Sequence, residues 1–163
     1  MCNTGSSNST LPSLEIAQPE DGDGYLVVAR ELLQGVEMLA TFTKVSPRAC
    51  ALIAAHSLEC TLKAYLWHKE KRSELVSQNV RHNILELWKL AYNENSLGIS
   101  ETPPTWVRIL SEGHGPNYYF RYQKGKSKKI VHGGQTSALA PMASQLSSLL
   151  TPGGAILPMP SVQ

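Results

Sequence analysis

The sequence has few features that would indicate a membrane protein or a metal-binding protein. Its 163 residues include only three cysteines, at positions 2, 50 and 60, and their spacing forms no metal-binding motif. No apolar run approaches the ~20 residues that cross a bilayer. The first residues lack the basic start and the apolar stretch of a secretory signal. We therefore expect a cytoplasmic protein with no metal, no cofactor and no membrane partner.

Motifs of several common enzyme classes are also missing. The sequence contains no CxxC, HExxH or GxSxG, and its lysine-rich stretch lacks the GxxxxGK[ST] order of a phosphate-binding loop. Its five histidines, at positions 56, 68, 82, 114 and 132, do not stand at ligand spacing from carboxylates. These absences argue against a zinc hydrolase, a serine hydrolase and a P-loop nucleotidase.

Acidic residues are missing from the last third of the chain. All 13 acids lie at or before Glu112, whereas five basic residues fall within the nine positions 121–129. Lysine and arginine attract phosphates, and aromatic rings stack on bases. The stretch predicts contact with RNA or a nucleotide, and the alternative is a solvated loop. The candidate binding residues are Arg121, Tyr122, Lys124, Lys126, Lys128, Lys129 and His132.

The middle of the chain has helical periodicity. Residues 1–22 are rich in Ser, Asn, Gly and Pro and predict a disordered lead, and 152–163 predict a loose tail. Between them, 23–151 predict one all-α domain, an antiparallel up-and-down bundle of four main helices plus one short helix. The main helices are expected at about 24–44, 47–69, 83–95 and 137–150, and the short one at about 104–112, ended by Gly113.

Three stretches in a fixed order resemble the HEPN superfamily. "AAHSLECTLKAYL" at 54–66 is followed by "RHNILELWKLA" at 81–91 and then by "YYFRYQ" at 118–123. The resemblance covers about residues 24–150 and implies a helical bundle that forms a homodimer. The positions that match the family pattern are Glu59 and Lys63 on the second helix, His82 at the start of the third, and Arg121-Tyr122.

The resemblance also implies a range of activities. Many family members are metal-independent RNases, including toxins paired with nucleotidyltransferase antitoxins, while others lack the catalytic pair and bind nucleotides or partner proteins. The nuclease signature is Arg, four to six residues, then His, and Arg108-x5-His114 satisfies it. A histidine can take the 2′-hydroxyl proton or protonate the leaving oxygen, and an arginine can hold the phosphate. Here Ile109 replaces a usually polar residue, and Gly113-His114-Gly115 interrupts the helical pattern.

The ionisable residues of the second helix have a structural and a functional interpretation. Glu59 and Lys63 stand at i, i+4 with Glu leading, which predicts an ion pair at the solvent edge of the bundle worth ~0.3–0.5 kcal/mol. Alternatively they line a groove, joined by His56 three residues before Glu59. We expect His82 to mark the start of the next helix, with Asn83 as the better capping residue.

Three functional hypotheses follow. The first is a nucleotide- or RNA-binding module of a defence or toxin–antitoxin system. The second is a metal-independent endoribonuclease that uses Arg108 and His114. The third is a non-catalytic protein-interaction domain whose ionisable residues only fix the register of the bundle.

Overall fold

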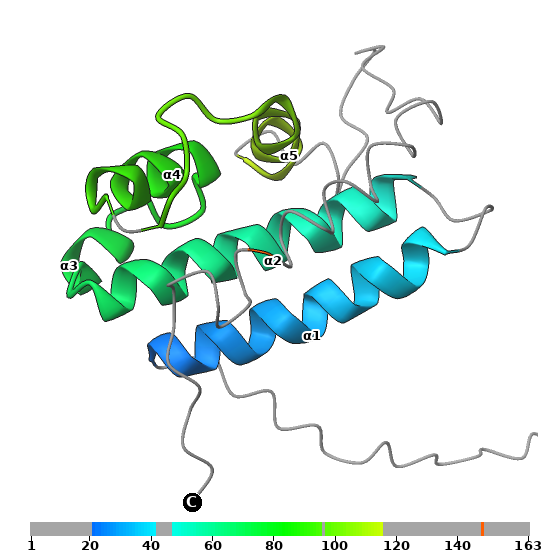
Figure 1. Cartoon of the computed structure of the whole chain (residues 1–163), viewed down its shortest axis with the longest axis horizontal. Helices are drawn as coiled ribbons and strands as arrows, with labels where there is room; N and C mark the ends of the chain where they lie inside the picture. The colour runs from blue at the N-terminus through cyan, green and yellow to red at the C-terminus, as the bar shows by residue number, and fades with distance from the viewer. Residues whose placement is uncertain (1–20, 42–46, 96, 116–147, 149–163) are drawn as a thin grey trace, which may run out of the picture.

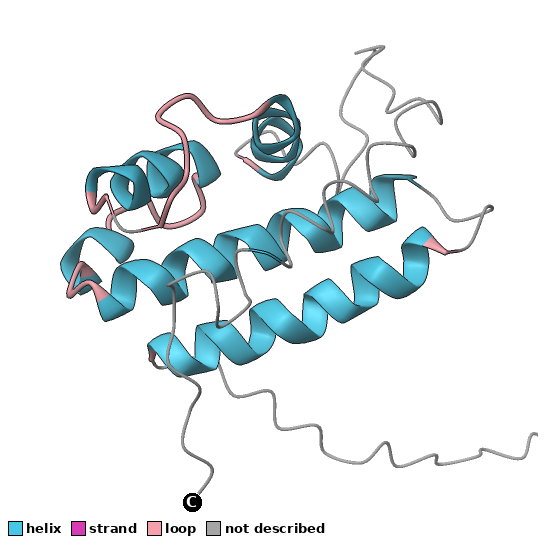
Figure 2. Cartoon of the chain, in the orientation of Figure 1, coloured by secondary structure: helices cyan, strands magenta, loops and turns pink. Residues whose placement is uncertain are grey.

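The computed structural model describes residues 21–41, 47–95, 97–115 and 148. Within these ranges the chain forms helices and loops and no strand, which confirms the all-α class (Figure 2). The helices are α1 (Gly22–Ala40), α2 (Pro47–His68), α3 (Arg72–Leu75), α4 (Ile84–Asn93) and α5 (Thr105–His114).

Helix α2 lies at the centre of this arrangement. Helix α1 runs antiparallel along one side of it, and α4 and α5 pack on the opposite side (Figure 1). Helix α5 is seen nearly end-on in the view that shows α1 and α2 lengthwise, so it crosses them steeply. The helix expected at 137–150 falls outside the described residues except for Ser148, so the up-and-down bundle stays a prediction. No helix in the described ranges is both long and apolar enough to span a bilayer.

Local sequence signals explain where the helices begin. Asp21 caps α1, because its Oδ1 accepts a hydrogen bond of 2.7 Å from the amide of Gly24. Asn83 caps α4, accepting from the amides of Leu85 at 3.2 Å and Glu86 at 3.3 Å, which confirms the predicted capping residue. Helix α2 begins at Pro47 as expected, since a proline is tolerated in the first helical turn.

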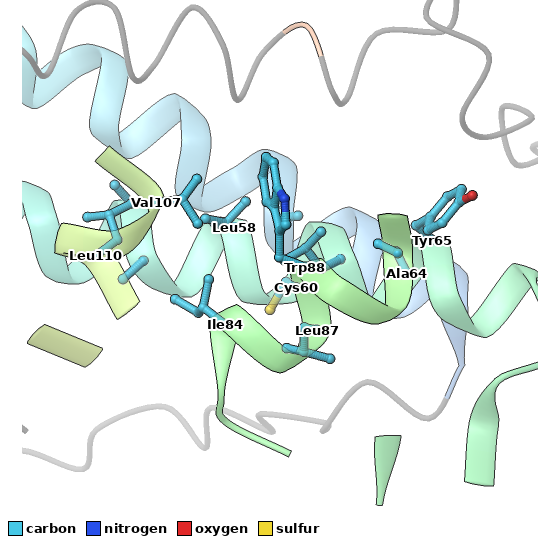
Figure 3. Close-up of a cluster of buried hydrophobic side chains, with 14 of the residues drawn as sticks. Leu58, Cys60, Ala64, Tyr65, Ile84, Leu87, Trp88, Val107 and Leu110 are labelled. Atoms are coloured by element: carbon cyan, nitrogen blue, oxygen red, sulfur yellow. The ribbon is translucent and has the colours of Figure 1, made fainter. Parts of the chain in front are cut away.

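The core forms around the second half of α2. Every residue from Ser57 to Leu66 is buried, so this part of the helix is covered on all sides. Figure 3 shows the cluster on the side of α4 and α5, where Leu58 lies near Val107 and Leu110. Cys50 and Cys60 are both buried and form no disulfide.

Candidate functional site

Helix α2 carries a carboxylate and an ammonium group inside this core. Glu59 is 2% exposed and Lys63 is 5% exposed, and the Lys63 Nζ donates to Glu59 Oε1 at 2.6 Å. The expectation of a solvent-edge ion pair is therefore wrong. Helix α1 packs on one side of α2, and α4 and α5 pack on the other, so this turn lies inside the fold.

Two histidines from distant parts of the chain bind the same carboxylate. His114, the last residue of α5, places Nε2 2.6 Å from Glu59 Oε2. His82, just before the Asn83 cap of α4, places Nδ1 3.0 Å from Oε1. An ionised carboxylate only accepts hydrogen bonds, so each of these ring nitrogens carries the proton. We call Glu59, Lys63, His82 and His114 the Glu59 network.

The network keeps Glu59 ionised. Burial alone would raise the pKa of this carboxyl, but the hydrogen bond from His114 and the charge and hydrogen bond of Lys63 outweigh it and lower the pKa from 4.5 to about 2. Lys63 balances the resulting negative charge. Its ammonium also lies 5.4 Å from the centre of the Tyr25 ring, a cation–π contact that connects the network to α1.

The two histidines differ in their access to solvent. His114 is 3% exposed, and its Nδ1 is buried with no hydrogen-bond partner among the described residues. The side chain of His82 is 57% exposed. His56, predicted to join Glu59, is exposed on α2, with its ring centre 6.2 Å from that of His114.

Arg108 lies away from the network. It is exposed and lines a groove of about 760 Å³ together with Trp88 and Lys89 of α4 and Glu112 of α5. Arg108 and His114 are six residues apart, which places them about 120° apart around a helix. Within one chain the structure therefore does not bring together the predicted catalytic pair. Two basic residues and three glutamates line the groove, so its net charge is negative and does not favour an anion.

Helix α5 extends further than its sequence suggested. It continues through Gly113 to His114, and Gly115 is the capping residue, so the expected break at Gly113 is wrong. Val107, Leu110, Ser111 and His114 are all buried at i, i+3, i+4 and i+7. This spacing was the available signal that His114 belongs to the inner face of α5, and it was missed.

The predicted phosphate-binding residues are not described by the structure. They comprise Arg121, Tyr122, Lys124, Lys126, Lys128, Lys129 and His132, and all lie between 116 and 147. In the part of the chain that is described, no group of three or more His, Cys, Asp or Glu side chains could hold a metal ion.

Comparisons with known proteins found no similar protein. No family model, no curated protein and no solved structure matches the chain. The resemblance to the HEPN superfamily thus rests on the three sequence stretches at 54–66, 81–91 and 118–123 and stays a prediction.

Proposed function

We propose that the chain is an HEPN-like helical module that binds RNA or a nucleotide and acts in a defence or toxin–antitoxin setting. The observation that carries this proposal is the convergence of Glu59, Lys63 and His82 on one buried cluster. These residues come from two separate stretches of the family-like pattern. Their contact in space supports the view that the pattern describes one structural unit.

The ligand follows from charge. Five basic residues and no acid lie beyond α5, and the first of them, Arg121, is seven residues after His114. Since His114 is held on α2 through Glu59, the last described residues before this basic stretch are fixed to the core. Positive side chains with tyrosines among them favour a ligand that has both phosphates and bases.

The test is the binding of a labelled single-stranded RNA at several salt concentrations. We expect the affinity to fall steeply with salt, because each phosphate contact releases counterions. Replacing Lys126, Lys128 and Lys129 together with Ala should flatten the logarithmic slope by about 2, since each phosphate that a lysine neutralises adds ~0.7 to that slope.

A matched triple variant controls for net charge. Lys69, Arg72 and Lys89 are exposed basic residues on the described surface, and replacing them with Ala removes the same charge. We expect this variant to bind nearly as the wild type does. Salt-insensitive binding, or equal losses in both triple variants, would contradict the proposed role of the basic stretch.

A second candidate is the metal-independent endoribonuclease. It is suggested by the 2.6 Å contact between His114 and Glu59, because a carboxylate that orients an imidazole is a recurrent arrangement in acid–base catalysis. Both ring nitrogens of His114 are buried in the described chain, so catalysis would require this side chain to become accessible to the RNA. Since Arg108 lies on another side of α5, the phosphate-holding arginine would be Arg121 or would come from a second copy in a homodimer.

Cleavage separates the two candidates. Labelled RNA is incubated with wild-type protein and with the Arg108→Ala/His114→Ala double variant, both in EDTA. Cleavage by the wild type alone would establish the endoribonuclease, and salt-dependent binding without cleavage would support the binding module. Neither binding nor cleavage would leave an interaction domain, for example one that holds a nucleotidyltransferase-type partner.

A further inference from the structure

His82 is the member of the Glu59 network that faces solvent. Its Nδ1 donates to the buried Glu59 carboxylate, while 57% of its side chain is exposed. Its second nitrogen, Nε2, makes no hydrogen bond to any residue that the structure describes. An ordinary surface histidine forms its hydrogen bonds with water. His82 differs, because one of its ring nitrogens is bound to a buried carboxylate while the other faces solvent.

The hydrogen bond from Nδ1 to Glu59 determines whether Nε2 is a hydrogen-bond donor or an acceptor. In the neutral ring the proton is on Nδ1, so Nε2 has the lone pair; in the imidazolium Nε2 becomes a second donor. Because Glu59 is held by Lys63 and His114 as well, the ring is fixed in place before any ligand arrives.

The charged residues described around His82 balance one another, so they leave no net negative charge to oppose an anion at Nε2. Glu59 and Lys63 face it from α2 and balance each other, and His114 of α5 lies on the far carboxylate oxygen. On its own segment Arg81 precedes it and is exposed, and Glu86 in the first turn of α4 is the opposing acid. The positive end of the α4 dipole lies directly after His82.

We propose that His82 is a phosphate-contacting residue, with its Nε2–H donating to a phosphate oxygen of the bound RNA or nucleotide and Glu59 acting as the positioning residue. This inference rests on the proposed function and names a second contact point for the same ligand, on the described face of the molecule. A hydrogen bond is the appropriate chemistry, because the described residues around His82 supply no set of metal ligands.

Three variants test it in RNA binding at pH 6. His82→Ala removes the imidazole, and His82→Asn keeps a donor near the Nδ1 position but has nothing at Nε2. We expect both to bind about tenfold more weakly than the wild type at pH 6, the effect of losing one charge-assisted hydrogen bond. The control is His68→Ala, since His68 also pairs with a carboxylate, that of Asp23, but at the C-terminal end of α2, nine residues after Glu59.

The outcomes distinguish the two proposals. If the lysine triple variant loses RNA while His82→Ala and His82→Asn bind as the wild type does, the role of His82 is wrong and the binding module stands. If the wild type binds no RNA, the proposed function fails. A titration of the ¹⁵N-labelled wild type with inorganic phosphate then decides the role of His82: a shift of its Nε2 resonance supports the contact, and no shift overturns it.

Discussion

The two sides of α2 are held in different ways. Towards α1 the contact is largely apolar, with Leu26, Ala29, Leu33 and Val36 buried and a hydrogen bond of 2.8 Å from Ser57 Oγ to the carbonyl of Ala29. The partly exposed pair of His68 with Asp23 and the cation–π contact of Lys63 with Tyr25 lie on the same side. Towards α4 and α5 the apolar cluster surrounds a carboxylate that binds two histidines. The apolar side distributes its stabilisation over many atoms, whereas the polar side depends on one group.

This difference sets the tolerance of each side to substitution. A volume-conserving apolar change such as Leu26→Met should cost less than about 1.5 kcal/mol, because neighbouring side chains can repack. A buried charge tolerates substitution poorly, since removing its partner leaves a charged group in the core with no opposite charge beside it. Substitutions in the Glu59 network and at the helix caps test that asymmetry.

The largest effect is expected for Glu59→Leu. It leaves the Lys63 ammonium buried without its carboxylate, and both histidines lose their acceptor. We expect a loss of about 3–5 kcal/mol in the free energy of unfolding, measured by urea denaturation. The matched control is Glu59→Leu/Lys63→Met, which removes both charges and should recover much of that loss. If the double variant is no more stable than the single one, the cost does not come from the uncompensated lysine.

The next prediction concerns acid. The pKa of Glu59 is lowered from 4.5 to about 2, so its folded form binds the proton less tightly than the unfolded chain does. This stabilisation is complete above pH 4.5 and is lost as the pH falls towards 2. Its size is about 3 kcal/mol, from ~1.4 kcal/mol for each unit of pKa difference.

Urea denaturation at pH 6, 4 and 3 measures this loss. Glu59→Gln cannot titrate, so its stability should fall less over the same interval. Equal pH dependence in both proteins would mean that other carboxylates are responsible.

The two histidines should differ in their effect on stability. His114→Ala removes a buried charge-assisted hydrogen bond and leaves a cavity, so we expect a loss of about 2–3 kcal/mol. His82→Ala opens a half-exposed site that water can fill, and about 1 kcal/mol or less is expected. Thermal unfolding of the two variants side by side measures the contrast. Equal losses would mean that access to solvent does not separate their roles.

Sequence reasoning succeeded where the signal was local. The all-α class, the start of α2 at Pro47 and the Asn83 cap all depend on residues within one or two turns of each other. The burial of Glu59 does not, because it arises from helices that the sequence does not place against α2. His82 and His114 are 23 and 55 residues away from Glu59, and no local spacing connects them.

The same limit applies to a helix that was not predicted and to the spacing of Arg108 and His114. Helix α3 has four residues, too few for a periodic pattern, and was not predicted. The Arg108-x5-His114 spacing matched a signature, but spacing alone does not say which side of a helix each residue occupies. The apolar stripe of α5 does say so for His114, and it leads to the carboxylate rather than to Arg108.

The smallest effect compares the helix caps on the two sides of α2. Asn83→Ala removes the acceptor of two α4 amides, and Asp21→Ala removes that of one α1 amide. Each should cost about 1 kcal/mol in the free energy of unfolding. Their effects on RNA binding should differ, because Asn83 follows His82 directly whereas Asp21 adjoins Gly22, which lies against Trp67 and His68 at the C-terminal end of α2. Fluorescence titration with the same RNA checks this, and Asn83→Ser, which restores a capping oxygen, should bind as the wild type does. Equal losses of affinity in Asn83→Ala and Asp21→Ala would show that the start of α4 has no special part in holding the ligand.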